Sequence, residues 1–237
     1  MKLSTQYGNT NIEFELVYRK RKTLAIQIKP PDKITVISPE ALSEDLIKEK
    51  VKSKGKWIIK KLIDFKDMGF TAFEREFING ESFMYLGRNY MLNITVDESL
   101  LRPKIELLDS RLQIKTPTKD KDILRKSMEK WYRREARKII KKRVEFYKPK
   151  FSIEPESVKI KEQKKRWGSC TIKGDLLFNW RVIMAPSPII DYIVVHEMSH
   201  LAIKNHSVKF WKSVENILPD YKDRRKWLKD YGVRMDL

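Results

Sequence analysis

Apolar and polar residues alternate along much of the first half of the chain, with the period of two that is typical of β-strands. Between residues 12 and 37 the alternation falls into three short runs, whose apolar members are Ile12, Phe14 and Leu16, then Leu24, Ile26 and Ile28, then Ile34 and Val36. It returns between residues 76 and 117, where Asn79-Gly80 favours a hairpin turn. These patterns predict mainly antiparallel strands.

A helical period separates the two groups of strands. Ser43 precedes Glu44 and Asp45, an arrangement that is typical of a helix start. The apolar residues that follow recur on one helix face: Leu46, Ile47, Val51, Ile58 and Leu62. We therefore expect one helix over residues 43–68, which crosses a β-rich N-terminal subdomain formed by residues 1–117.

Helical periods dominate the second half of the chain. A long helix over residues 118–148 is expected to precede a strand hairpin and a strongly apolar, buried helix that begins near Ser187. Two shorter helices follow, with Ser207 and Asp220 as their expected caps. The sequence thus predicts an α+β fold with a second domain over residues 118–237.

The apolar helix contains the motif His196-Glu197-x-x-His200. Residues four apart share one helix face, so the two imidazoles point toward one position. Glu197 would lie beside a metal there without binding it, as the general base for a water that the metal activates. The chain has three histidines, all in this region, which favours a catalytic zinc ion, one per chain, over two unrelated core histidines.

His206 is the expected third ligand, because catalytic zinc usually has three protein ligands. On a continued helix this residue would lie about 9 Å beyond His200 and on another side of the cylinder. We therefore expect the helix to break near Lys204-Asn205, with Asn205 in the left-handed conformation that ends many helices.

The hairpin before this helix offers a strand edge that could pair with the backbone of an extended peptide. We expect substrate contacts from Arg166, Trp167, Gly168, Ser169 and Asn179, although Trp167 could equally be a core residue. An oxyanion donor is also needed. Tyr192, Arg181 and Tyr221 remain alternatives for that donor.

The formal net charge of the chain is +19. A lysine-rich solvated surface and an anionic partner, such as nucleic acid or a nucleotide, explain this charge equally well. The single cysteine excludes an internal disulfide and fits a reducing compartment. Because neither a signal peptide nor a membrane-spanning stretch is visible, we expect a cytoplasmic protein without a membrane partner.

Several motifs together resemble the YgjP-like metallopeptidase family, which is related to SprT-like and WLM-type zinc peptidases. They are Arg166-Trp167-Gly168-Ser169-Cys170, Asn179-Trp180, Asp191-Tyr192, His196-Glu197-x-x-His200, Asn205-His206-Ser207 and Phe210-Trp211. The resemblance covers roughly residues 12–230 and implies a zincin-like catalytic domain with the three histidines as ligands and Glu197 as base. Metzincins carry Gly at the position of Ile203, so no Met-turn is expected.

The sequence therefore predicts a zinc-dependent metallopeptidase, an endopeptidase that acts on polypeptides. One alternative is a metal-dependent nucleoside-triphosphate (pyro)phosphohydrolase, motivated by the charge and the run Lys164-Lys165-Arg166. Another is a nucleic-acid-associated protease that cuts bound proteins. A purely structural zinc is disfavoured, because such sites usually have four protein ligands and no convincing fourth is present.

Overall fold

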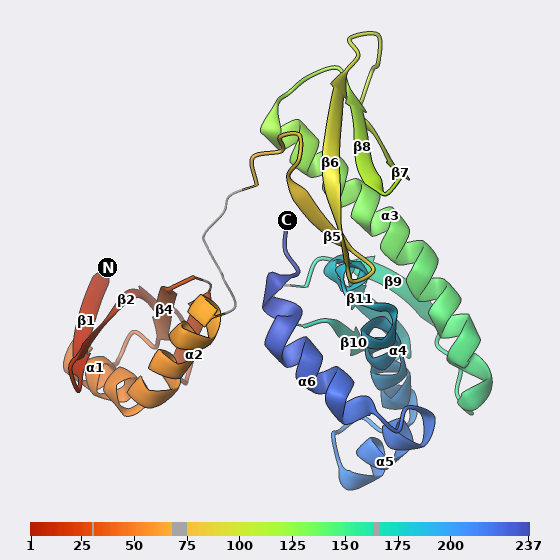
Figure 1. The fold of residues 1–237 in the computed structure, drawn as a ribbon. Helices are drawn as coiled ribbons and strands as arrows, with labels where there is room; N and C mark the ends of the chain where they lie inside the picture. Colours follow the sequence, from red (N-terminus) through yellow and green to blue (C-terminus); the bar gives the residue numbers. More distant parts are fainter. Residues whose placement is uncertain (30, 68–74, 164–165) are drawn as a thin grey trace. The chain divides into compact units, whose positions relative to one another are not determined.

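The computed structural model describes residues 1–29, 31–67, 75–163 and 166–237. The chain divides into two compact units, Met1–Glu74 and Arg75–Leu237. Each unit combines helices with small sheets, which confirms the α+β class (Figure 1). Within the described ranges, no helix is both long enough and apolar enough to span a membrane.

The first unit contains a four-stranded sheet and two helices. Its strands are β1 (Lys2–Tyr7), β2 (Thr10–Tyr18), β3 (Ala25–Lys29) and β4 (Lys33–Ser38), in the order β1-β2-β4-β3. The pair β2/β4 is parallel and the other two pairs are antiparallel. The alternating apolar residues pack against the helices in a core formed by Ile12, Phe14, Leu16, Ile34, Val36, Ile47, Val51 and Ile58.

The prediction of one continuous helix over residues 43–68 is wrong, because the structure has two helices, α1 (Glu44–Ser53) and α2 (Gly55–Asp67). Lys54 ends α1, and its N–H group donates to the Val51 carbonyl at 3.0 Å. A Cβ atom on Gly55 would lie only 2.3 Å from the Tyr7 ring. Glycine therefore lets this ring of β1 pack directly against the helix backbone at the break.

The second unit begins with a sheet of the same topology. Its strands are β5 (Ser82–Tyr85), β6 (Arg88–Val96), β7 (Lys104–Leu108) and β8 (Arg111–Thr116), in the order β5-β6-β8-β7. The long helix α3 (Lys121–Tyr147) follows, and its N-cap is Asp120 rather than a residue near 118. The Asp120 carboxylate accepts from the Ile123 N–H group at 3.0 Å.

Residues 75–117 belong with the second unit, whereas the sequence pattern placed the boundary between residues 117 and 118. The reason is that α3 packs on this sheet and on the residues that follow α3 in one continuous core. The Tyr132 hydroxyl of α3 donates to the Met84 carbonyl at 2.8 Å. The turn after β5 also bonds to the C-terminal part of the chain, with Gly87 N–H donating to the Met184 carbonyl at 2.9 Å.

The C-terminal region, from residue 148 onward, contains a three-stranded sheet and three helices. Its elements are β9 (Ser157–Lys161), β10 (Gly168–Cys170), β11 (Asp175–Asn179), α4 (Ser187–Ala202), α5 (Val208–Ile217) and α6 (Tyr221–Tyr231). Short 3-10 turns occupy Lys148–Lys150, Trp180–Met184 and Gly232–Arg234. The strand order is β10-β11-β9, so β10 is an edge strand, and α4 packs against β10, α3, α5 and α6 (Figure 1).

Candidate metal centre and substrate pocket

Helix α4 (Ser187–Ala202) carries His196, Glu197 and His200 and is buried along most of its length. Its N-cap is Pro186, and Ser187 is already the first helical residue. A bidentate ion pair joins Asp191 in the second turn to Arg143 of α3 at 2.5 and 2.9 Å. Packing and this pair therefore hold the motif helix in place against α3.

The helix ends before the predicted break. Its C-cap is Ile203, whose backbone is extended with φ −125° and ψ 103°. Asn205 is not one of the described non-glycine residues that have a positive φ. The prediction of a left-handed conformation at Asn205 is therefore wrong. The extended Ile203 also places its carbonyl oxygen 2.9 Å from His200 Nδ1.

This contact defines the tautomer of His200. A carbonyl oxygen only accepts hydrogen bonds, so His200 Nδ1 is the donor, and in the neutral tautomer that does this the lone pair is on Nε2. Such a bond from the second ring nitrogen is the usual way in which a metal-binding histidine is oriented. The residue that ends the helix thus also orients one imidazole of the candidate site.

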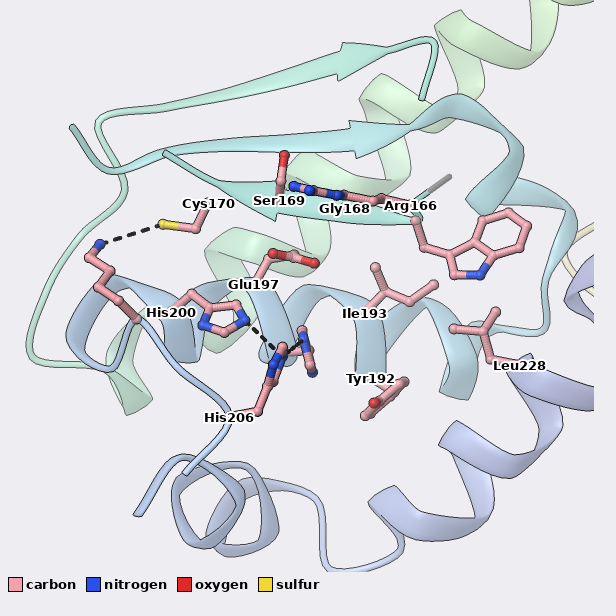
Figure 2. Close-up of a pocket in the computed structure, with 13 residues that line it drawn as sticks. Arg166, Gly168, Ser169, Cys170, Tyr192, Ile193, Glu197, His200, His206 and Leu228 are labelled. Carbon is pink, nitrogen blue, oxygen red and sulfur yellow. Dashed lines mark hydrogen bonds between the residues drawn. The ribbon is translucent and has the colours of Figure 1, made fainter. Parts of the chain in front are cut away.

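The three histidines converge through their Nε2 atoms, with His206 lying 3.0 Å from His196 and 3.2 Å from His200 (Figure 2). Their possible ligand atoms all lie within 4.8 Å of one another. Nitrogens bound at ~2.0–2.1 Å to one tetrahedral zinc are about 3.3 Å apart. The observed separations therefore fit a single zinc ion.

The electrostatics of the cluster fit a cation as well. Burial, with further contributions from His200 and His206, lowers the pKa of His196 to about 3, so its ring is neutral. His196 Nδ1 is buried and lacks a hydrogen-bond partner among the described residues. Phe210 stacks on His200 at 4.4 Å between ring centroids, and Trp211 stacks on His206 at 5.5 Å. Aromatic packing thus holds the two rings.

Glu197 is 6% exposed and lies beside this cluster. Burial raises the pKa of its carboxyl group to about 8, and the positive charge of Arg166 partly offsets the effect. Figure 2 shows the carboxylate between β10 and the histidines. It packs directly on Gly168, where an added Cβ atom would lie 2.6 Å from Glu197 Cγ. Gly168 therefore leaves the space that the Glu197 side chain occupies.

We expect Gly168→Ala to lower kcat by up to ~10²-fold, because a methyl group there must displace the carboxylate from its position beside the three histidines. The capacity to bind a metal ion should remain, since the histidines are not displaced. The measurement is kcat on a peptide substrate, together with the zinc content of the purified variant.

Ile172→Ala, just beyond the same strand, is the control. Its side chain is 96% exposed and does not line the pocket, so activity within about twofold of wild type is expected. Full activity of Gly168→Ala would show that Glu197 does not need this space.

The histidine cluster forms one wall of a pocket of about 600 Å³. Its lining residues are Arg166, Trp167, Gly168, Ser169, Cys170, Tyr192, Ile193, His196, Glu197, His200, Lys204, His206 and Leu228. Four of the five expected substrate contacts are among them. Asn179 is not, and its amide instead donates to the Gln163 carbonyl at 2.7 Å and the Arg166 carbonyl at 3.3 Å. It therefore holds the backbone of Gln163 and Arg166, which precede β10.

Other lining residues were not expected from the sequence. Ile193 lies one turn before Glu197 on the same helix. Residues four apart share a helix face, so this spacing could have placed Ile193 beside Glu197 in the pocket. Leu228 reaches the pocket from α6, far along the chain, and Lys204 from the segment after α4. The cysteine also lines the pocket but is not part of the histidine cluster, and Lys164 and Lys165 lie outside the described residues.

The three residues expected as oxyanion donors differ in whether they line the pocket. Tyr192 lines the pocket, and burial raises its pKa to about 12, so its hydroxyl keeps its proton. Arg181 instead pairs with Glu162 at 2.6 Å and Asp236 at 2.7 Å. Tyr221 is buried against Trp211, with 5.4 Å between the ring centroids. Of the three, Tyr192 is the residue that reaches the pocket.

The sequence matches the family model described as YgjP-like, metallopeptidase domain, over residues 22–231. The metallopeptidase zymogen of Pyrococcus abyssi abylysin is 24% identical over 38% of this chain and 93% of its own, with a TM-score of 0.35. The metallopeptidase zymogen of Methanocaldococcus jannaschii jannalysin is 26% identical over 37% of this chain and 90% of its own, with a TM-score of 0.33. A comparison with curated proteins found no match. Because the family match spans most of the chain, this protein belongs to the YgjP-like metallopeptidase family.

Proposed function

We propose that the protein is a zinc-dependent peptidase that binds one zinc ion through His196, His200 and His206. The observation that carries this proposal is the convergence of three imidazole Nε2 atoms beside the buried carboxylate of Glu197. Three histidines leave one position of a tetrahedral zinc open, as catalytic sites require. When bound, zinc supplies a Lewis acid that polarises a carbonyl group and lowers the pKa of water.

Glu197 is the proposed general base. A cation held by the histidines would favour the ionised form of its buried carboxyl group. The carboxylate would then accept a proton from the attacking water and return it to the amine that leaves when the peptide bond breaks. The side chain lies between the histidines and β10, where both the water and the scissile bond would have to be. Burial against Gly168 holds its position, so the proton acceptor is oriented before substrate arrives.

Strand β10 (Gly168–Cys170) is the proposed binding edge for an extended polypeptide. Its other side pairs with β11, and its residues line the pocket. An edge strand can bind a peptide through backbone hydrogen bonds, which makes few demands on the sequence of the substrate. Tyr192 is the proposed donor to the oxyanion, and a Tyr192→Phe variant with unchanged kcat would remove it from that role.

Hydrolysis of a nucleoside triphosphate at the same metal is a second candidate. Arg166 and Lys204 line the pocket, and Arg225 influences the charge state of both His196 and His206. Three cationic side chains around a metal favour an anionic substrate. An acidic polypeptide and a nucleotide both have that chemistry, and a basic surface could also recruit nucleic acid with bound proteins.

One product analysis distinguishes the candidates. Wild-type protein, without a tag, is incubated with a mixture of an unfolded polypeptide and nucleoside triphosphates, and the products are read by mass spectrometry. We expect new peptide termini and intact nucleotides, with cleavage stopped by a zinc chelator in the presence of ample magnesium. Release of phosphate or pyrophosphate, with the polypeptide intact, would contradict the peptidase proposal and support the nucleotide hydrolase instead.

A further inference from the structure

The first unit contains a groove that is separate from the metal pocket. It has a volume of about 1060 Å³. Its lining residues are Lys22, Thr23, Leu24, Ile26, Pro39, Ala41, Leu42, Lys50, Ser53, Lys54 and Trp57. They come from β3 and the segment before it, from the connection between β4 and α1, and from the junction of α1 and α2. The groove therefore lies between a sheet edge and a helical face.

Strand β3 is an edge strand of its sheet, because within the described residues it pairs with β4 alone. In an antiparallel pair, alternate residues turn their N–H and C=O groups away from the partner strand. These groups of β3 are available to a further strand. Leu24 and Ile26 lie two residues apart, so their side chains share one face of the sheet and form the apolar floor beside that edge.

The second unit offers an internal comparison, because its first sheet has the same strand order and β7 takes the place of β3. There the space between edge strand and helix is filled by Ile105 and Trp131, which are 7% and 4% exposed. Arg134 of α3 also donates to the Ile105 carbonyl at 3.5 Å. The remaining cavity measures about 400 Å³. In the first unit, by contrast, Trp57 is 45% exposed and the groove is open.

The charge of the groove has one sign. Lys22, Lys50 and Lys54 line it, and no aspartate or glutamate is among its lining residues. In the part of the chain that the structure describes, none of these three lysines forms an ion pair with a carboxylate. An apolar floor with uncompensated lysines at its border suits a partner with an apolar centre and acidic flanks.

We propose that this groove binds an extended polypeptide segment of another protein, which has an apolar centre and acidic flanks and adds a strand to the free edge of β3. The unpaired backbone groups of the edge favour a polypeptide over a lipid or a nucleic acid, because a strand can satisfy them in register. The volume exceeds the ~300–1,000 Å³ of typical small-molecule sites, which suits several residues of chain. The inference does not depend on peptidase activity.

The test uses the full-length protein with Glu197→Gln, so that bound peptide is not cleaved. The probe is a fluorescein-labelled peptide of about ten residues, a length typical of a long strand, with valines at its centre and glutamates at both ends. Anisotropy gives its Kd. One control peptide carries Lys in place of Glu, and another has a central Pro, which removes a backbone donor. We expect both controls to bind more weakly by about tenfold or more.

Two double variants near the junction of α1 and α2 distinguish an effect of the groove from an effect of the overall charge. Lys50→Glu/Lys54→Glu reverses two lining residues, whereas Lys52→Glu/Lys56→Glu reverses two exposed residues outside the lining. Both change the net charge equally. We expect the first to weaken binding about tenfold or more and the second to leave Kd within about threefold. Thermal unfolding of each variant verifies that the first unit is folded.

Hydrogen exchange locates the bound peptide. Protection of β3 amides without protection of β1, the other edge of the same sheet, is the expected result. Equal weakening by the two double variants, protection confined to β1 or to the metal pocket, or no binding at all would overturn the proposal. A dimer of the protein that occupies the groove and excludes the peptide would overturn it as well.

Discussion

Glu197→Gln is expected to lower kcat on a peptide substrate by about 10²–10⁴-fold, the usual contribution of a positioned proton acceptor. The amide has the same shape, so it fits the space beside Gly168, but it cannot take a proton from water. Glu197 is not one of the three histidines that could hold the metal, and the variant should therefore bind zinc as wild type does. The measurements are steady-state kinetics and zinc content.

Glu145→Gln is the matched control for that variant. The Glu145 side chain is 71% exposed on α3, and its nearest basic partner, Lys148, lies 4.0 Å away, so full activity is expected. A Glu197→Gln protein that was loaded with zinc and still active would exclude Glu197 as the base. Loss of zinc in the same variant would instead place its carboxylate among the ligands.

His206→Ala should lose both zinc and activity. His206 supplies one of three convergent nitrogens, and its loss leaves two protein ligands, too few for the usual catalytic site. The decrease in zinc affinity should exceed the ~10–100-fold that follows from altering a hydrogen-bond partner of a ligand. Because His206 is exposed, the fold should remain. Zinc content after dialysis and competition with a chelator measure the effect.

Cys170→Ser tests whether any polar side chain in the pocket is as important. Cys170 lines the same pocket, yet it lies outside the histidine cluster, so this variant should keep one zinc per chain. Tight zinc binding by His206→Ala, or zinc loss from Cys170→Ser, would contradict the proposed set of ligands. Circular dichroism of both proteins verifies that the helices are unchanged.

The candidate metal centre was predictable because most of its geometry is local. A spacing of four residues on a helix places His196 and His200 on one face whatever the rest of the chain does. Glu197 is then beside them for the same reason. His206, the proposed third ligand, was also predictable as a member of the cluster, but the way in which it reaches the other two histidines was not. The extended backbone of Ile203, rather than a left-handed Asn205, ends α4.

The alternating pattern likewise identified strands but not what they pack against. A period of two tells which residues of a strand share a face, and it carries no information on which helix covers that face. The pattern therefore predicted that the sheet of residues 82–116 belongs to one subdomain with the N-terminal strands, whereas this sheet packs on α3. The break at Gly55 was hidden for a similar reason, because Tyr7 lies far away in the sequence.

The choice of the oxyanion donor shows the same limit. Tyr192, Arg181 and Tyr221 are equal candidates when only residue types are considered. Contacts between distant segments separate them, since Arg181 pairs with Asp236 and Tyr221 stacks on Trp211. The placement of His196, Glu197 and His200 thus follows from spacing within one helix, whereas His206 joins them from beyond its end. The walls of the site, its supporting contacts and the open groove at β3 depend on long-range packing, which local patterns do not encode.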